Sequence, residues 1–321
     1  MDVKISIIIP IYNVEQYIAQ CAHSLFKQTY QNIEFIFVDD ASPDNSVSIL
    51  EEIMREYGSR KEQITLIRKE KNEGLPQARK TGFEVCSGDY IIHVDSDDYI
   101  EFDMIEILVE KAISEKLDVV WCDYFENDKY VKACPQITDK IAILKGLLGF
   151  NLAAYLWNKL VKREIYHNGI CFPKAMQNED AVIFIQILFN AEKIGFLDKA
   201  FYHYRTNMNS ITRDKASLAK RSMDYYENYS WILNFLENKF GEDLEFLEPH
   251  LSYRVNHVKM KIMEAKETRD VKNLYELYPK SLNRLFIRYK NFTAYIQAIM
   301  LFLATKNILF PYKLTDLWRR R

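Results

Sequence analysis

Over its first hundred residues the chain alternates short β-branched runs with segments of helical apolar spacing, and this alternation is the strongest constraint on its fold. Strands are predicted at residues 5–9, 34–38, 64–67 and 90–94. Helices are predicted at residues 14–26, 42–54 and 76–85. Strands separated by helices favour an α/β fold with a parallel sheet and helices on both of its faces.

The limits of the first elements are also marked in the sequence. The run Ile5–Ile9 is apolar throughout and ends at Pro10, which is typical of a strand buried on both faces. Asn13 is a candidate N-cap for the first helix. The residues Ser42-Pro43-Asp44 open the second helix.

Beyond residue 100 the pattern is mixed. Helices are predicted at 104–113 and 181–189, and strands at 118–121, 194–197 and 201–204. Only helical periodicity is evident from about Ser217, and the segment Thr206–Asp214 is polar and aperiodic. We therefore expect a first domain over residues 1–212 and a helical C-terminal region over 213–321.

Composition and cysteine spacing exclude several classes of protein. The 321 residues are 48% hydrophobic and 27% charged, with nine Gly and eight Pro, so collagen-like, low-complexity and wholly disordered chains are excluded. The five cysteines contain no C-x-x-C pair, which favours reduced thiols in a cytoplasmic protein. The N-terminus lacks the pattern of a secretory signal peptide.

The C-terminal residues 281–321 are basic, with eight Lys or Arg against the single acid Asp316. They also carry apolar and aromatic residues, a combination that favours an anionic membrane surface. The alternative is that these residues pack a helical subdomain with a basic outer face. The apolar run Ala298–Ala304 is far shorter than the ~20 residues that span a bilayer. Nucleic acid is not an expected partner, because the whole chain is slightly acidic.

Ligands of open parallel sheets bind outside the carboxyl ends of the strands, so those ends are the candidate site. They carry Pro10-Ile11-Tyr12-Asn13, Asp39-Asp40 and Asp95-Ser96-Asp97-Asp98. Neither a G-x-G-x-x-G turn nor a G-x-x-x-x-G-K-[ST] loop is present, which argues against NAD-type and P-loop sites.

Asp95 and Asp97 are two residues apart after a predicted strand, so an extended chain directs both carboxylates to one side. Mg²⁺ and Mn²⁺ prefer such oxygen ligands and are commonly held by one or two carboxylates plus substrate phosphates. The alternative is a solvated turn whose aspartates cap the next helix.

A set of motifs carries a family resemblance. They are Ile5-Ser6-Ile7-Ile8-Ile9-Pro10-Ile11-Tyr12-Asn13, Ser24-Leu25-Phe26-Lys27-Gln28-Thr29-Tyr30, Val38-Asp39-Asp40-Ala41-Ser42-Pro43-Asp44, Asn72-Glu73-Gly74-Leu75, Ala78-Arg79 and Gly88-Asp89-Tyr90-Ile91 before Asp95-Ser96-Asp97-Asp98. In this order they resemble the family 2 glycosyltransferases over about residues 3 to 105.

A second block resembles the members of this family that build bacterial surface polysaccharides. Its motifs are Trp157-Asn158-Lys159-Leu160, Asn178-Glu179-Asp180, Tyr202-His203-Tyr204-Arg205 and Ser210-Ile211-Thr212. The resemblance fades after about residue 215. It implies a GT-A fold, with a nucleotide-binding half at about 1–100 and an acceptor half at about 101–212.

The resemblance also implies roles for residues that bind a UDP-sugar donor. Pro10 and Tyr12 line the base and ribose pocket, and Asp40, beside Asp39, accepts a hydrogen bond from the base edge. The alternatives are an ordinary core position for Tyr12 and an acid pair at a helix N-terminus for Asp39 and Asp40. Arg79 lies across the nucleotide, next to Lys80, where the family usually has Asn.

Other implied roles concern the metal and the diphosphate. Asp97 is the main ligand of Mn²⁺ or Mg²⁺, Asp95 faces the ribose or the metal, and Ser96 belongs to the donor site. Arg205 and Ser210 contact the diphosphate, and His203 contacts the diphosphate or the metal. The alternative for His203, which stands between two tyrosines, is a packed strand residue.

Asp180 is the implied catalytic base, which takes the proton of the acceptor hydroxyl in a single displacement with inversion. Glu179 and Trp157 are assigned to the acceptor side. The assignments of Asp180, Glu179 and Trp157 each have a structural alternative. Acids at the start of a helix are favoured by the helix dipole, and Trp157 can simply be part of the core.

The expected function is metal-dependent, inverting hexosyl or N-acetylhexosaminyl transfer from a UDP-sugar to a glycan or lipid-linked acceptor in surface polysaccharide synthesis. The expected location is the cytoplasm, including the cytoplasmic face of the inner membrane. The alternative is a protein that binds nucleotides or glycans on the same scaffold without transfer.

Truncation after residue 280 tests the membrane hypothesis. Because it removes the excess of positive charge together with apolar surface, we expect the shortened protein to stay in the supernatant when anionic liposomes are sedimented, while the full chain pellets. Equal pelleting of both forms would leave only the packing alternative.

Overall fold

The protein is described by a computed structural model, which covers residues 3–206, 218–247 and 249–251. Ser210 and the basic residues 281–321 lie outside the described residues. The chain divides into two compact units. The first comprises residues 1–143 and 152–210, and the second comprises 144–151 and 211–321. The second unit thus takes in residues 144–151, which the sequence pattern assigned to the first domain.

Most strands of the first unit lie close to positions predicted from the sequence, but the three short strands at residues 99–100, 129–131 and 159–162 were not predicted. They are β1 (Ile5–Ile11), β2 (Ile33–Asp39), β3 (Ile64–Arg68), β4 (Tyr90–His93), β5 (Tyr99–Ile100), β6 (Val119–Glu126), β7 (Lys129–Val131), β8 (Lys159–Lys162) and β9 (Ile194–Tyr204). The helices are α1 (Ile18–Phe26), α2 (Ser46–Glu56), the 3-10 helix η1 (Gly58–Gln63), α3 (Leu75–Val85), α4 (Met104–Glu115), α5 (Lys140–Leu148), which continues into the second unit, α6 (Arg163–His167) and α7 (Glu179–Asn190).

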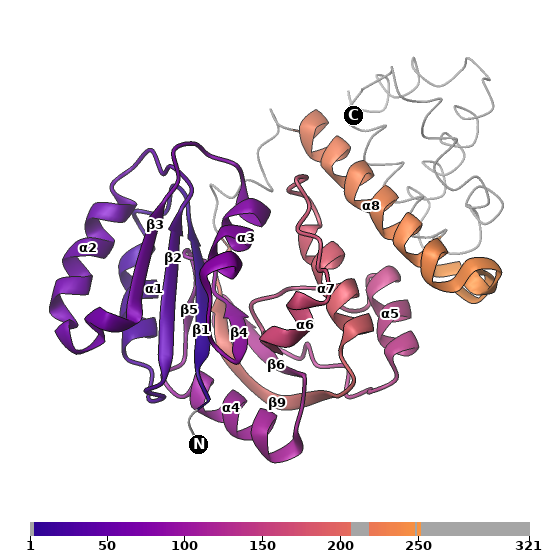
Figure 1. The fold of residues 1–321 in the computed structure, drawn as a ribbon, viewed down its shortest axis with the longest axis horizontal. Coiled ribbons are helices and arrows are strands. Elements are labelled where there is room, and N and C mark those ends of the chain that lie inside the picture. The colour runs from indigo at the N-terminus through magenta and orange to yellow at the C-terminus, as the bar shows by residue number, and fades with distance from the viewer. Residues whose placement is uncertain (1–2, 207–217, 248, 252–321) are drawn as a thin grey trace. The chain divides into compact units, whose positions relative to one another are not determined.

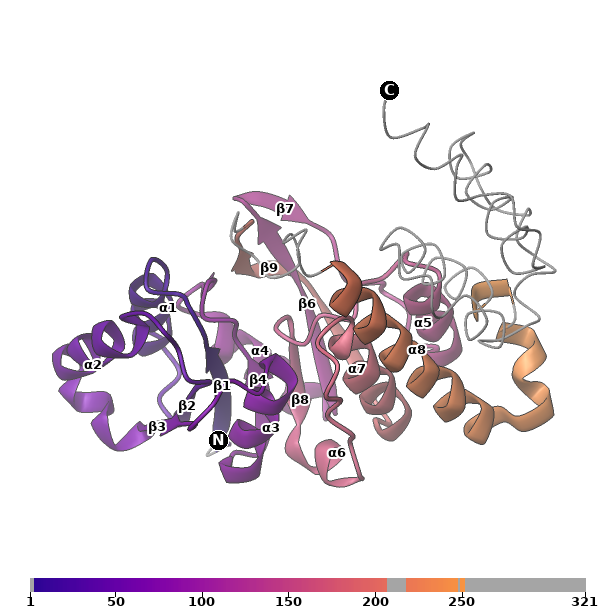
Figure 2. The ribbon, with the colours of Figure 1, turned by 90° about the horizontal axis from the view of Figure 1, so that it is seen from above.

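The nine strands among the described residues join one sheet, in the order β3-β2-β1-β4-β8-β6-β9-β5 with β7 paired to β6 (Figures 1 and 2). The strands β3, β2, β1 and β4 are mutually parallel, as predicted. Beyond β4 the sheet is mixed, because β8 runs antiparallel to both β4 and β6. In the β1–β2 register Ile11 lies opposite Asp39, so the carboxyl ends of these strands meet at one edge.

Helices pack on both faces of the sheet, as the alternation predicted (Figure 2). Alternate residues of β1 point to opposite faces. Ile7 and Ile9 belong to one cluster with buried residues of α1, α2 and α4. Ile8 faces α3, where a Cβ on Gly82 would lie 2.5 Å from the Ile8 Cγ2. The glycine therefore lets α3 approach the sheet closely.

The predicted starts of the first two helices are wrong, because the loops after β1 and β2 bind each other. Asn13 is in the left-handed region with φ 56°, and α1 begins only at Ile18. The amide of Asn13 donates to the Ser42 hydroxyl at 2.8 Å, and α2 begins at Ser46, whose hydroxyl accepts the Val14 amide at 3.0 Å. These contacts fix the chain segments that follow both strand ends.

Two predicted strands, 194–197 and 201–204, form the single strand β9, whose pairing with β6 contains irregularities near Asp123. All five cysteines are free thiols. In the second unit the described residues form α8 (Leu218–Phe240) and the 3-10 helix η2 (Gly241–Leu247), in line with the predicted helical character (Figure 1). No helix among the described residues is long and apolar enough to span a membrane.

Candidate active site

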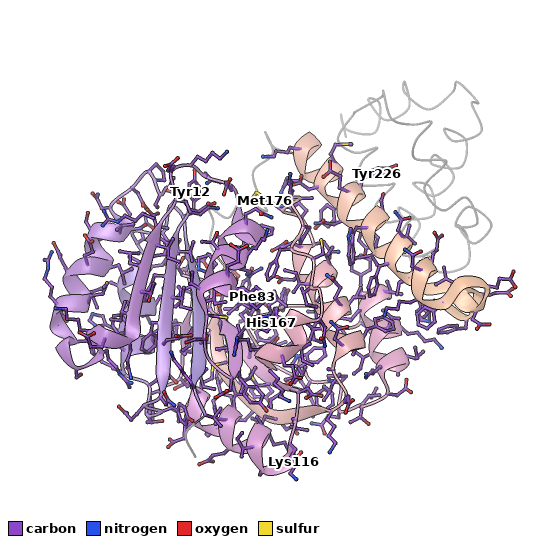
Figure 3. The ribbon with its side chains drawn as sticks, viewed as in Figure 1. Tyr12, Phe83, Lys116, His167, Met176 and Tyr226 are labelled. Atoms are coloured by element: carbon purple, nitrogen blue, oxygen red, sulfur yellow. The ribbon has the colours of Figure 1, made fainter. Side chains whose placement is uncertain are left out.

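The candidate site lies at the carboxyl edge of the parallel strands. Tyr12 follows β1 and is 39% exposed, whereas Pro10 is buried within the strand. Figure 3 shows Tyr12 and Met176, from the loop before α7, on the same upper side of the first unit, and Lys116, at the end of α4, on the opposite side.

Three residues around this edge have left-handed backbone conformations. They are Asn13, Ala41 and Asn178, with φ of 56°, 57° and 63°. Such conformations are unfavourable for residues other than glycine, and they cluster at functional sites where the surrounding structure holds them in place. Asn178 immediately precedes α7, so its conformation directs the first turn of that helix.

Asp40 connects the end of β2 to the loop before α3. Its carboxylate accepts the Gly74 amide at 2.7 Å and the Glu73 amide at 3.0 Å, and it pairs with the Lys69 ammonium at 2.9 Å. A carboxylate has about four acceptor positions, so these three donors leave about one for a further partner. The Asp39 carboxylate accepts the Ser42 amide at 2.8 Å, and burial raises the pKa of Asp39.

A tyrosine on β9 holds the acidic loop after β4. The Tyr202 hydroxyl accepts the Asp95 amide at 3.1 Å and donates to the Asp98 carboxylate at 2.8 Å. The second oxygen of Asp98 accepts the Arg205 amide at 2.7 Å. Burial, followed by repulsion from Asp97 and Asp95, raises the pKa of Asp98. Asp98 therefore has a structural role in this loop.

Arg79 on α3 is 1% exposed and contacts three carboxylates. Its Nη2 donates to Asp95 at 2.9 Å. Its Nη1 donates to Asp180 at 2.6 Å and to Glu179 at 3.2 Å. The sequence prediction placed Arg79 across a nucleotide, whereas in the structure both terminal nitrogens of its buried guanidinium bind carboxylates and its Nε has no hydrogen-bond partner among the described residues. One side chain thus holds the loop after β4 and the first turn of α7 together.

Glu179 and Asp180 form a buried acidic pair at the start of α7. Burial raises the pKa of Glu179, and the adjacent Asp180 carboxylate adds to this effect. Burial also raises the pKa of Asp180, although the Arg79 guanidinium opposes the shift. Carboxylates that share a site do not readily ionise together, and a base with a raised pKa is suited to proton transfer near neutral pH.

Asp95 and Asp97 have the donor chemistry that a divalent cation requires. The Asp95 side chain is 23% exposed and contacts Arg79 through one oxygen only, and Asp97 is partly exposed. No group of three or more His, Cys, Asp or Glu within the described ranges is arranged to hold a metal. Two carboxylates nevertheless fit Mg²⁺ or Mn²⁺ when substrate phosphates supply further ligands.

The prediction of His203 as a metal ligand is not supported by its position. Alternation along β9 places His203 on the face opposite Tyr202, which holds the acidic loop. Its ring stacks on Tyr99 and Phe125 at 4.2 and 4.7 Å, and its Nε2 lies 2.7 Å from Glu101. These contacts pack the imidazole against Tyr99 and Phe125, which favours the interpretation of His203 as a packed strand residue.

The prediction that Trp157 stacks on a sugar also disagrees with the structure, which favours the core alternative. Trp157 is 2% exposed, and the rings of Tyr202 and Tyr155 stack on it at 4.2 and 4.7 Å. Its packing instead supports Tyr202 from below. Ser96 is buried to the same degree as Asp39 and Asp40, with exposures of 5%, 7% and 3%.

Arg205 lies close to the acidic loop. Its guanidinium stacks over Tyr99 at 4.6 Å, and its Nη2 is buried without a hydrogen-bond partner among the described residues. Leaving a buried donor without a partner costs free energy. The Arg205 Nη2 is therefore available to donate a hydrogen bond to an anion. Tyr202 and Lys159 received no role from the sequence. Both belong to motifs of the family resemblance, but Tyr202 bonds to Asp95 and Asp98, more than a hundred residues away, and Lys159 lies over the rings of Trp121 and Phe184.

The mixed sheet with helices on both faces, and with carboxylates at the carboxyl ends of its parallel strands, is that of the GT-A fold. Comparison with known proteins agrees with this class. The family described as Glycosyl transferase family 2 matches residues 6–171, and the chain belongs to this family.

Curated relatives and solved structures support the assignment. The Bacillus subtilis (strain 168) protein "Uncharacterized glycosyltransferase EpsJ" is 34% identical over 220 residues, 65% of this chain and 62% of the relative, so the match spans less than two thirds of its length. "Glycosyltransferase GlyG" of Streptococcus pneumoniae serotype 4 is 32% identical over 68% of this chain and 76% of the relative. The crystal structure of S. aureus TarS 1-349 in complex with UDP-GlcNAc shares the fold, with a TM-score of 0.65, 21% identity and coverage of 94% of this chain and 87% of that one.

Replacing Arg79 by Met removes the cation shared by three carboxylates. We expect a loss of roughly 3–5 kcal/mol of stability, the cost of breaking a buried ion pair. The loss should be larger at pH 8 than at pH 5.5. The folded-state pKa values of Glu179 and Asp180 are raised, so the folded protein loses stability as they ionise, and without Arg79 that loss increases.

Thermal unfolding of both proteins at the two pH values measures this effect. Arg60→Met is the matched control, because Arg60 is also buried but donates to the carbonyls of Gln28, Gln31 and Tyr30 and to the Gln63 amide oxygen. Its destabilisation should differ little between pH 5.5 and 8. A pH-independent loss in Arg79→Met would contradict the proposed electrostatic origin.

Proposed function

We propose that this glycosyltransferase moves a sugar from a UDP-sugar to a hydroxyl of a glycan or lipid-linked acceptor, with inversion and with a divalent cation, in the synthesis of a bacterial surface polysaccharide. The observation that carries the proposal is the contact of one buried guanidinium with both Asp95 and Asp180. The two terminal nitrogens of Arg79 thus hold the Asp95 carboxylate, proposed to face the donor, beside the Asp180 carboxylate, proposed to be the catalytic base.

The donor half of the proposal is supported by the ends of β1 and β2. The exposed ring of Tyr12 offers a surface for a base, and the Asp40 carboxylate retains an acceptor position for the N3 proton of uracil. Asp39, next to it, is the second candidate acceptor. The complex of TarS with UDP-GlcNAc shows that a protein of this fold binds such a donor.

Arg205 is the candidate partner of the diphosphate. Its Nη2 has no hydrogen-bond partner among the described residues, and its backbone amide is fixed by Asp98. A guanidinium held in this way can donate to phosphate oxygens in a planar fork. Ser210, which the family resemblance assigns to the same group, remains part of the proposal.

The metal half of the proposal rests on Asp97 and Asp95, with Mn²⁺ or Mg²⁺ as the cation. A divalent cation held by these carboxylates supplies positive charge that offsets the charge developing on the leaving diphosphate. Arg79 fixes one oxygen of Asp95, so the other oxygen is the one that can face a ligand.

Asp180 is the proposed base. Arg79 binds its Oδ1, which leaves Oδ2 to accept the proton of the attacking hydroxyl. The hydroxyl attacks the anomeric carbon, and the bond from this carbon to the diphosphate oxygen breaks, so that UDP leaves. The new glycosidic bond has the inverted configuration. Glu179, on the same turn, is the proposed contact for the acceptor.

The donor and metal assignments are tested together with a panel of nucleotide sugars. We expect the protein to hydrolyse or transfer from UDP-sugars in Mn²⁺ and to lose this activity in EDTA. Asp97→Asn should weaken UDP binding in Mn²⁺ by roughly tenfold or more, at about 1.4 kcal/mol per factor of ten, as measured by calorimetry.

The matched control is Asp89→Asn at the opposite end of β4, where the carboxylate accepts the Lys4 amide. It should leave UDP binding unchanged. Turnover of no donor, together with nucleotide binding that does not depend on metal, would instead favour a binding protein on this scaffold.

Asp180→Asn tests the base. The amide keeps the shape of the side chain and an oxygen for Arg79 but does not take a proton, so we expect unchanged donor affinity and a fall in kcat of roughly 10²–10⁴-fold. Calorimetry and steady-state kinetics separate the two effects.

Asp139→Asn is the control for the alternative that any acid at the start of a helix has this effect. Asp139 precedes α5 and accepts the Ala142 amide at 2.6 Å. It should lose a little stability without losing turnover. A nearly normal kcat in Asp180→Asn would refute the assignment of the base.

A further inference from the structure

Lys159, the first residue of β8, carries a buried ammonium group beneath the candidate site. The residue is 1% exposed. Its Nζ donates to the Asn158 side-chain oxygen at 2.8 Å and to the Tyr155 carbonyl. It also lies over the rings of Trp121 and Phe184, 3.9 and 4.5 Å from their centroids. Lysine is rarely buried in this way.

The ammonium faces the helix that carries the proposed base. Phe184, over which it lies, is four residues after Asp180 in α7, so both side chains are on the same face of that helix. Asp180 is also the strongest charge acting on Lys159. No ion pair with a carboxylate is found for Lys159 among the described residues, so its charge acts through space.

Burial of this charge has a physical cost that the contacts of Lys159 only partly offset. An apolar side chain of similar length would fill the space between Trp121 and Phe184 without desolvating an ammonium. Burial lowers the pKa of Lys159 to about 7, and Asp180 opposes this effect. A cation kept at this position is therefore better explained by its effect on a neighbour than by its own stability.

Other groups act on the same pair. Asp180 also faces Arg79 from α3, Asp95 after β4, its helix neighbour Glu179 and the Tyr166 hydroxyl of α6. Arg79 favours the ionised form of Asp180, whereas Asp95 disfavours it.

The remaining titratable neighbours of Lys159 are the thiols of Cys122 on β6 and Cys134. Burial raises the pKa of both thiols, that of Cys122 to about 12, so both thiols are neutral at physiological pH.

We propose that Lys159 is a positioning residue that acts through Asp180, because its buried ammonium favours the ionised, proton-accepting form of that carboxylate. The inference rests on the proposed role of Asp180. It assigns a function to the third residue of the Trp157-Asn158-Lys159 motif. Asn158 joins β8 to β6 by donating to the Cys122 carbonyl, and Trp157 packs under Tyr202.

The experiment measures the titration of Asp180 directly, in the full-length protein without substrate. Aspartate is labelled with ¹³C at Cγ, and the Asp180 signal is identified by its absence in Asp180→Asn. Lys159→Met should move the Asp180 titration to higher pH by about one unit, the smaller end of the shift caused by a nearby opposite charge. The acidic limb of the kcat/KM profile should move by the same amount.

Lys162→Met on the same strand is the matched control, because Lys162 is partly exposed and pairs with Glu164. It should leave the Asp180 titration in place. Lys159→Gln is a second neutral variant that can still donate to the Tyr155 carbonyl, and it should give the same shift as Lys159→Met. Thermal unfolding of each variant establishes that it is folded.

The outcomes separate this inference from the proposed function. An unchanged Asp180 titration in the folded Lys159 variants, or a uniform loss of kcat at every pH without a shift of the acidic limb, would overturn it. A shifted titration in a protein that turns over no donor would support the action of Lys159 on Asp180 and contradict the proposed transfer.

Discussion

The guanidinium of Arg79 is the interaction on which the candidate site depends. It is fully enclosed and bonds to Asp95, Glu179 and Asp180, which come from two segments about 85 residues apart in the chain. Without a shared cation, three carboxylates this close would repel one another and their burial would be costly. With it, the end of β4 and the start of α7 are held in one geometry before any ligand binds. The bidentate, planar form of the guanidinium suits this task better than the point charge of a lysine.

Two further contacts fix the parts of the site that Arg79 does not reach. Asp40, which follows β2, accepts the backbone amides of Glu73 and Gly74 in the loop before α3. Tyr202 on β9 accepts the backbone amide of Asp95 in the loop after β4. In each case a side chain at a strand end binds the main chain of a neighbouring loop, so the loop geometry follows from the sheet. Gly74 is in the left-handed region with φ 90°, and a Cβ there would lie 3.1 Å from the Met176 sulfur. A residue with a side chain would disturb both the conformation and this packing.

The sequence was sufficient to predict the parallel strands and the acidic residues at their ends, because both depend on local patterns: continuous β-branched runs such as Ile5–Ile9, and acids directly after them. It was insufficient where long-range contacts decide the structure. Asn13 is a residue type that commonly caps helices, yet the hydroxyls of Ser42 and Ser46 accept the amides of Asn13 and Val14 and hold this segment outside the helix. His203 follows Tyr202 directly, but strand alternation sends the two side chains to opposite faces. The short strands β5 and β8 are defined by pairing with distant strands, which no local pattern specifies.

The balance of charge explains why so many buried ionisable groups can coexist at this edge. Asp95, Asp97, Glu179 and Asp180 supply four acids. Among the described residues Arg79 is the cation that contacts three of them, and Lys159 acts from the side of α7 that carries Phe184. The raised pKa values of Glu179 and Asp180 show that the free protein limits this excess of negative charge by favouring protonation of the pair. Additional positive charge near Asp95 would relieve the same excess and favour the ionised pair instead. The carboxylates that fit a cation and the carboxylate that fits a base are therefore electrostatically linked through the residues that hold them, even though they lie on separate segments of the chain.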